Sequence, residues 1–363
     1  MGPLIIAAGT RPEIIKMAPI IRALERKKVP SFFVHCGQHY DYNMSQQFIE
    51  DLELPEPGYS YRIKAESQGV QTARIIVHME RLIRSTFPQA VFVEGDTNCV
   101  LATALAAVKL GTPVGHVEAG LRSFDLRMPE EHNRRLTDHL STFLFAPTET
   151  SASNLKRENV WGKTFTIGNT IIDAVMQHLP IAERKSTILN SVRFDEFILA
   201  TAHRAENVDD PKVLNDFMKA FTEAPIPVVY SMHPRTRKRL KQNNTLKSLQ
   251  RTKNVQILPP LGYLDFLVLM KKCSFIVTDS GGIQEEATAP CMTKHVLVTR
   301  VSTERPEAVE TGFAEVVGTN KDAIVAAMEK TLNNPEKLPI TSPYGEGTAA
   351  ERIVGIVRRE LAC

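Results

Sequence analysis

Several features that mark other classes of protein are scarce or missing in this chain of 363 residues. The five cysteines, Cys36, Cys99, Cys273, Cys291 and Cys363, are odd in number and form no C-x-x-C pair. Neither a disulfide framework nor a zinc site is expected from them. The ten histidines show none of the H-E-x-x-H or H-x-H spacings that mark metal sites. We therefore expect reduced thiols and no metal.

Long apolar runs and a strong excess of one charge are also absent. No run approaches the ~20 residues of a membrane span, and the net charge is only +3, with Lys and Arg dispersed along the chain. A nucleic-acid or anionic-membrane partner is therefore not expected. The first residues carry no basic leader and pass directly into a strand-like run, so we expect no signal peptide and a cytoplasmic protein.

Short apolar runs alternate with longer helical patterns, as in the βαβ units of a parallel sheet. Strands are predicted at 4–8, 31–34, 90–93 and 143–146, and helices at 12–28 and 99–110. Further strands are predicted at 197–201, 228–231, 255–258, 275–278 and 295–299. The repetition predicts an α/β chain of two Rossmann-like domains facing across a cleft, formed by residues 1–169 and 170–347. A last helix in 348–363 is expected to pack back on the first domain.

Acidic residues follow the predicted strands of the first domain. Asp96 and Glu118 each come just after a strand-like run, and Glu130 follows a proline that can begin a helix. Carboxylates held close together shift one another's pKa and can divide proton donation from proton abstraction. Alternatively, Asp96 and Glu130 only cap helices. Arg134 and Arg135 either hold one acid ionised or form an ordinary ion pair on a helix surface.

The second domain carries a glycine-rich turn at a predicted strand end. The paired Gly281 and Gly282 let the backbone approach an anion, and the Ser280 hydroxyl can donate to it. The helix that follows turns its positive end toward the same place, and Glu286 in it could reach sugar hydroxyls. The alternative is a tight strand-to-helix turn with an N-cap serine, because a short glycine motif is weak evidence.

Basic side chains lie at further strand ends. Arg11 and Lys16 flank the first helix start, and His203, Arg204 and Arg305 follow later strands. Such groups can donate hydrogen bonds to a diphosphate. A single Lys is more often a solvated residue on a helix face, and a His at a strand end is often only hydrogen-bonded.

These motifs together resemble the non-hydrolysing UDP-N-acetylglucosamine 2-epimerases over nearly the whole chain. The segments that carry the resemblance are 9–13, 37–39, 95–97, 116–122, 129–134, 168–170, 203–204, 279–286 and 303–307. The resemblance implies the two-domain GT-B fold, a UDP-sugar substrate, UDP-N-acetylmannosamine as product, and neither NAD nor metal. We also expect a homodimer.

The resemblance implies a role for each matching residue. It makes the catalytic candidates Asp96, Glu118, Glu130 and His203, and the substrate contacts Arg11, Lys16, Arg134, Phe266, Ser280, Gly281, Gly282, Glu286 and Arg305. Bacterial members also bind a second UDP-N-acetylglucosamine, and the matching positions here are Gln38, His39, Arg204 and His233. Asp41 and Ser67 differ from the residues that the family has at this second site, and they weaken the attraction of the site for an anion. We therefore expect conversion of UDP-N-acetylmannosamine without an activating UDP-N-acetylglucosamine.

Chemistry restricts the route to such an inversion. The C2 hydrogen of the sugar is not adjacent to a carbonyl, so simple deprotonation would give an unstabilised carbanion. Elimination of UDP to 2-acetamidoglucal, followed by re-addition, avoids that carbanion, and a diphosphate cradle with several carboxylates suits it. Four alternatives stay open: an epimerase of UDP-2,3-diacetamido-glucuronic acid, a hydrolysing epimerase, a GT-B glycosyltransferase and a non-catalytic UDP-sugar sensor.

Overall fold

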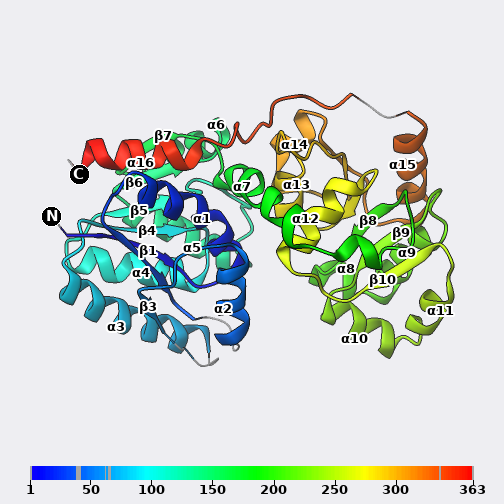
Figure 1. Cartoon of the computed structure of the whole chain (residues 1–363), viewed down its shortest axis with the longest axis horizontal. Coiled ribbons are helices and arrows are strands. Elements are labelled where there is room, and N and C mark those ends of the chain that lie inside the picture. Colours follow the sequence, from blue (N-terminus) through cyan, green and yellow to red (C-terminus); the bar gives the residue numbers. More distant parts are fainter. Residues whose placement is uncertain (1, 38–41, 62, 64–66, 335–336, 362–363) are drawn as a thin grey trace. The chain divides into compact units, whose positions relative to one another are not determined.

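The computed structural model describes residues 2–37, 42–61, 63, 67–334 and 337–361 (Figure 1). It divides into two compact units. Unit 1 comprises Met1–Ala174 and Tyr344–Cys363, and unit 2 comprises Val175–Pro343. Helix α7 (Thr170–Lys185) contains the division between the two units, which falls between Ala174 and Val175. Each unit contains a parallel sheet with helices, which confirms the predicted α/β class.

Unit 1 is built on a seven-stranded parallel sheet of order β3-β2-β1-β4-β5-β6-β7. The strands are β1 (Leu4–Ala8), β2 (Ser31–His35), β3 (Tyr59–Ser60), β4 (Ala90–Glu94), β5 (Val114–Val117), β6 (Phe143–Ala146) and β7 (Lys163–Thr166). Strands β1, β4, β5 and β6 are buried along their whole length. Central parallel strands are covered on both faces, which explains their continuous apolar sequences.

The helices of unit 1 lie on both faces of this sheet. They are α1 (Arg11–Arg26), α2 (Tyr42–Asp51), α3 (Gln68–Thr86), α4 (Asn98–Lys109), α5 (Pro129–Leu140), α6 (Glu149–Arg157) and α16 (Ala349–Glu360). Figure 1 shows α1 with α16 on one side of the strands and α3 with α4 on the other. The Asp173 carboxylate accepts hydrogen bonds from the backbone N–H groups of Ala349 and Ala350, which anchors the start of α16.

Unit 2 is built on a six-stranded parallel sheet of order β10-β9-β8-β11-β12-β13. The strands are β8 (Ile198–Thr201), β9 (Val228–Ser231), β10 (Val255–Leu258), β11 (Ile276–Thr278), β12 (Val296–Val298) and β13 (Ala314–Val316). The helices are η1 (Ile188–Ser191), α8 (Ala205–Val208), α9 (Pro211–Thr222), α10 (Pro234–Gln242), α11 (Leu246–Arg251), α12 (Tyr263–Lys272), α13 (Gly281–Glu286), α14 (Pro306–Glu310) and α15 (Lys321–Asn333). Its core includes Phe217, Phe221 and Tyr230, all fully buried.

The order of strands reverses at one place in each sheet. In unit 1, β1 lies between β2 and β4, and in unit 2, β8 lies between β9 and β11. Open parallel sheets bind ligands beyond the carboxyl ends of strands at such a switch point. The loops after β1, β4, β8 and β11 are therefore the first places to look for a site.

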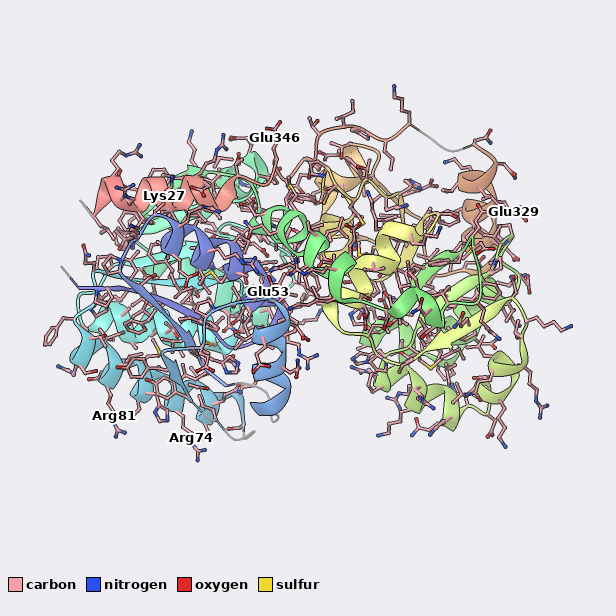
Figure 2. The ribbon with its side chains drawn as sticks, in the orientation of Figure 1. Lys27, Glu53, Arg74, Arg81, Glu329 and Glu346 are labelled. Carbon is pink, nitrogen blue, oxygen red and sulfur yellow. The ribbon has the colours of Figure 1, made fainter. Side chains whose placement is uncertain are left out.

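Charged surface side chains surround both units. Figure 2 shows Arg74 and Arg81 of α3 projecting from unit 1 and Glu329 of α15 projecting from unit 2. Among the described residues, no helix combines the length and apolarity needed to cross a membrane.

Candidate active site

Two neighbouring strand ends of unit 1 carry acidic residues. Strands β4 and β5 pair in register, with Glu94 opposite Val117, and Gly95 N–H donates to the Val117 carbonyl at 3.2 Å. Asp96 and Glu118 therefore follow adjacent strands. Glu118 has φ +69°, a conformation that non-glycine residues adopt at a cost and that clusters at functional sites.

Helix α1 delivers one cation to this place. Lys16 Nζ forms an ion pair with Glu118 and lies 3.1 Å from Oε1 of Glu94. Asn169 Nδ2 donates to Glu118 Oε2 at 3.5 Å. The side chains of Lys16, Glu94 and Glu118 are 12%, 2% and 7% exposed. Because water is largely excluded, these charges interact far more strongly than surface ions do.

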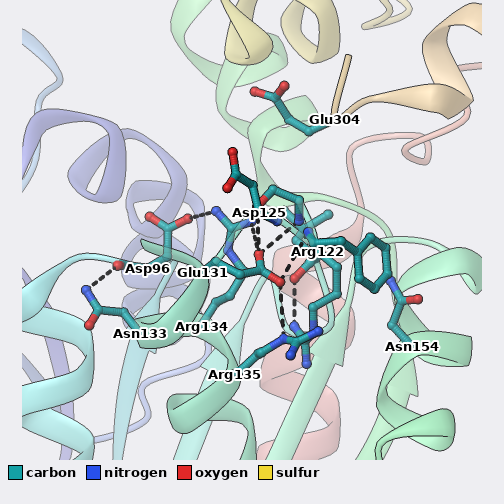
Figure 3. A network of polar contacts seen from close by, with 12 residues as sticks. Asp96, Arg122, Asp125, Glu131, Asn133, Arg134, Arg135, Asn154 and Glu304 are labelled. Carbon is teal, nitrogen blue, oxygen red and sulfur yellow. Dashed lines mark hydrogen bonds and ion pairs between the residues drawn. The ribbon is translucent and has the colours of Figure 1, made fainter. Parts of the chain in front are cut away.

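Helix α5 delivers a second cation, Arg134, which pairs with Asp96 (Figure 3). Its Nη1 also lies 3.0 Å from Oε2 of Glu131, which accepts from the N–H and the hydroxyl of Ser123 at 2.9 Å each. Burial acts to raise the pKa of Glu131, but the Ser123 hydrogen bonds and the Arg134 charge outweigh it and lower that pKa. Asn133 Nδ2 donates to the Asp96 carbonyl at 2.9 Å.

The structure answers the helix-capping alternative differently for Asp96 and for Glu130. Helix α4 begins at Asn98 with Thr97 as its N-cap, so Asp96 lies outside that helix. Glu130 lies in the first turn of α5 and is exposed, while the next residue, Glu131, is fully buried. The position of Glu130 is thus compatible with its capping role as well as with its catalytic one.

A network of charged residues lies next to the end of β5, and three of its members, His116, Arg122 and Asp138, are buried. His116 Nδ1 lies 2.7 Å from Asp138 Oδ1, and its Nε2 lies 2.8 Å from the Gly95 carbonyl. Arg122 Nη2 lies 2.8 Å from Asp138 and 2.7 Å from Glu158. These contacts fix the turn between β4 and Asp96.

In unit 2, one carboxylate organises the loop after β8. Asp279, at the end of β11, accepts from the backbone N–H groups of His203 and Arg204 and from Asn207 Nδ2. Its Oδ1 lies 2.9 Å from His203 Nδ1. Burial acts to raise the pKa of Asp279, but the interactions with His203 and Arg204 outweigh it and lower that pKa. The basic residues His203 and Arg204 are therefore held at the switch point by a fixed negative charge.

The glycine-rich turn of unit 2 is tightly packed on one side. A Cβ at Gly281 would lie 2.7 Å from Glu304 Oε1, whereas a Cβ at Gly282 would meet nothing within 4 Å. Glu304 itself pairs with Arg204 at 2.5 Å and with Arg300. Burial opposes ionisation of Glu304, but Arg204 and the neighbouring arginines lower its pKa to about 2. The side chain of Ser280 does not cap α13.

The remaining predicted ligands of unit 2 lie on, or just before, the helices that follow β9, β10, β11 and β12. Arg305 Nε lies 2.6 Å from Glu285 Oε1. Phe266 on α12 and Glu286 on α13 are half-buried. His233 is exposed, accepts at Nδ1 from the N–H of Arg235 at 3.2 Å, and places its ring 5.8 Å from that of His203.

The predicted second-site residues are only partly described. Gln38 and His39 lie outside the described residues, as does Asp41. Ser67 is the N-cap of α3 and accepts from the Val70 N–H. In unit 1, the Arg11 guanidinium lies 5.6 Å from the centre of the Phe48 ring.

Sequence reasoning gave no role to three buried acids, Glu13, Glu94 and Glu131, nor to Glu158, whose side chain is 23% exposed. Glu94 closes a strand and Glu131 follows a candidate acid, so neither stood out as a separate signal. Within the described ranges, no group of three or more His, Cys, Asp or Glu residues is arranged to hold a metal ion.

Two parallel α/β units with charged loops at both switch points define an enzyme of the GT-B-like class. The chain belongs to the UDP-N-acetylglucosamine 2-epimerase family, whose model matches residues 22–358. The family predicted from the motifs is therefore confirmed.

Individual relatives agree with that assignment. The UDP-N-acetylglucosamine 2-epimerase of Methanocaldococcus jannaschii is 47% identical over 98% of each chain. Its crystal structure in complex with UDP-GlcNAc and UDP has a TM-score of 0.87, covering 98% of this chain and 99% of that one. The Neisseria meningitidis UDP-GlcNAc 2-epimerase bound to UDP-GlcNAc also has a TM-score of 0.87, at 35% identity, covering 98% of this chain and 100% of that one.

Proposed function

We propose that this enzyme interconverts UDP-N-acetylglucosamine and UDP-N-acetylmannosamine by eliminating and re-adding UDP. The observation that carries the proposal is the pair of acid–cation contacts at adjacent strand ends, Lys16 with Glu118 and Arg134 with Asp96. Each contact places a carboxylate in a partly dry setting, where it can take or give a proton. The names of the relatives supply the substrate.

We assign proton transfer to unit 1. Removal of the C2 proton as the C1–O bond to UDP breaks gives 2-acetamidoglucal and UDP. Return of a proton to the opposite face, with re-formation of the C1–O bond, gives the epimer. Asp96, Glu118 and Glu130 are the proposed acids and bases for these two faces, with His203 of unit 2 as a further candidate.

We assign UDP binding to unit 2. Elimination leaves negative charge on the departing diphosphate, and preorganised donors stabilise such charge. His203 and Arg204 are held by Asp279, and Ser280 opens the turn with the tightly packed Gly281. Glu286 is the proposed partner of ribose hydroxyls. Arg11 and Arg305 are proposed as further contacts, together with Phe266.

The test is proton NMR of UDP-N-acetylglucosamine incubated with the protein in heavy water. We expect UDP-N-acetylmannosamine with deuterium at C2 and no added cofactor, because the abstracted proton exchanges with solvent on a carboxylate. Complete retention of hydrogen at C2 would contradict the elimination route. Release of free sugar with UDP would indicate a hydrolysing enzyme instead.

A second substrate has one observation in its favour. The UDP-2,3-diacetamido-2,3-dideoxy-D-glucuronate 2-epimerase of Pseudomonas aeruginosa is 40% identical over 95% of this chain and 96% of that protein. Parallel incubations with both UDP-sugars decide between them, since the preferred substrate has the higher kcat/KM. We further propose that the enzyme acts as a cytoplasmic homodimer, which sedimentation and cell fractionation can check.

A further inference from the structure

Two glutamates in unit 1, Glu94 and Glu118, share a single lysine, Lys16. Lys16 comes from α1, Glu94 ends β4 and Glu118 follows β5. A third glutamate, Glu13, is buried one turn before Lys16 on α1. Two ionised carboxylates with one ammonium would leave one uncompensated negative charge where little water reaches, which is strongly unfavourable. At least one proton is therefore retained by this pair at neutral pH.

Two of these carboxyls contact the same ammonium at the ends of paired strands. The side chains of Glu94 and Glu118 are 2% and 7% exposed, so one of them retains a proton, which the other carboxylate can accept in a hydrogen bond. Lys16 contacts both of them. The arrangement is a carboxyl pair that holds one proton and one negative charge, with the ammonium balancing that charge.

The deeper member of the pair is the one that keeps the proton. Burial raises the pKa of Glu94 well above its ordinary value, Lys16 opposes this, and the charges of Glu118 and Glu13 add to it. His116, a titratable residue on the neighbouring strand β5, is engaged on both ring nitrogens, by Asp138 and by the Gly95 carbonyl.

We propose that Glu94 is a positioning residue for Glu118, donating its proton in a hydrogen bond that orients the Glu118 carboxylate and shares its charge. The inference rests on the proposed function, in which Glu118 exchanges a proton with the substrate. When Glu118 accepts that proton, the pair passes from one proton and charge −1 to two protons and no charge. Giving the proton back restores the first state.

Two variants of similar volume separate this role from simple packing. Glu94→Gln keeps a neutral donor, whereas Glu94→Met keeps the bulk and removes the donor. We expect kcat to fall by about 10²-fold in Glu94→Met, as for loss of acid–base function, with KM changed much less. Glu94→Gln should recover at least about 10-fold of that loss. Equal kcat in the two variants would overturn the proposal.

The pH profile gives a second readout. In the wild type, raising the pH removes the shared proton and leaves two adjacent anions, so turnover falls on the alkaline side. In Glu94→Gln the amide does not ionise, so this fall should move to higher pH. An unchanged alkaline limb would contradict a shared proton. Glu80→Gln, at an exposed position on α3, controls for effects of a Glu-to-Gln substitution that are unrelated to the site.

An infrared measurement keeps this inference separate from the proposed function. We expect the wild type at neutral pH to show a protonated-carboxyl absorption that is reduced in Glu94→Gln and in Glu94→Met. Presence of that band in a protein that turns over neither UDP-sugar would sink only the proposed function. Identical spectra in an active enzyme would sink only the assignment of the proton to Glu94.

Discussion

Units 1 and 2 share one architecture, but the pKa values of Glu13 and Glu94 in unit 1 shift in the opposite direction from those of Asp279 and Glu304 in unit 2. In unit 1, burial raises the pKa of Glu13 to about 7 and that of Glu94 well above its ordinary value. In unit 2, burial also opposes ionisation, but cationic neighbours and hydrogen bonds outweigh it. The pKa of Asp279 is lowered, and that of Glu304 falls to about 2.

The difference follows from the number of donors around each acid. One cation, Lys16, is shared by two carboxylates, Glu94 and Glu118. The single carboxylate of Glu304 interacts with three arginines, Arg204, Arg300 and Arg305. A buried carboxyl with too few cations and hydrogen-bond donors around it keeps its proton, whereas one with enough of them stays charged. This contrast agrees with the proposal that unit 1 transfers protons and unit 2 holds basic loops in place.

The largest expected effect tests the proton-transfer side. Glu118→Gln, Asp96→Asn and Glu130→Gln should each lower turnover by roughly 10²-fold or more, while UDP still binds because the proposed UDP contacts of unit 2 are intact. Initial rates and calorimetric UDP titrations measure the two quantities. Near-normal turnover in Glu130→Gln would leave that exposed residue with its helix-capping role only.

A smaller effect tests the loop-holding side. Gly281→Ala forces its Cβ against Glu304 Oε1 and should weaken UDP binding by about 10-fold, since Glu304 also pairs with Arg204. Gly355→Ala on α16, outside every proposed contact, is the matched control, because its Cβ meets nothing within 4 Å. Equal UDP affinity of the two variants in titration calorimetry would show that Glu304 does not order the turn.

The smallest expected effect is a change of the free energy of unfolding with pH, opposite in sign in the two units. Its size is on the order of 1 kcal/mol in each unit after allowance for solvent screening. Glu13 has a raised pKa, so its contribution to the stability of unit 1 is lost as pH rises from 4.5 to about 7. Glu304 has a lowered pKa, so its contribution to unit 2 is lost as pH falls from 4.5 to about 2. Glu13→Gln and Glu304→Gln should each flatten only the slope of their own unit.

Hydrogen exchange of core amides in each unit, measured across this pH range, follows the two stabilities separately. If the stability of both units changed with pH in the same direction, the opposite pKa shifts of these carboxyls would not determine the stability of the units.

The sheets were largely predictable because their central strands are short, apolar and buried on both faces, as residues 4–8 and 90–94 are. Strands β3 and β7 escaped prediction because their side chains are mostly exposed and carry no apolar run. At the site, the strand-end positions of Asp96 and Glu118 followed from the same pattern. The pairing of Arg134 with Asp96 and of Lys16 with Glu118 joins segments far apart in the chain.

The sequence by itself determined the α/β class, the family and the acids that follow the strands, because local apolar periodicity and turn chemistry are written into neighbouring residues. Only the tertiary structure decided that Glu94 and Glu118 share Lys16. Protonation depends on burial and on charges a few ångströms away, and those distances exist only after α1, β4 and β5 have packed together.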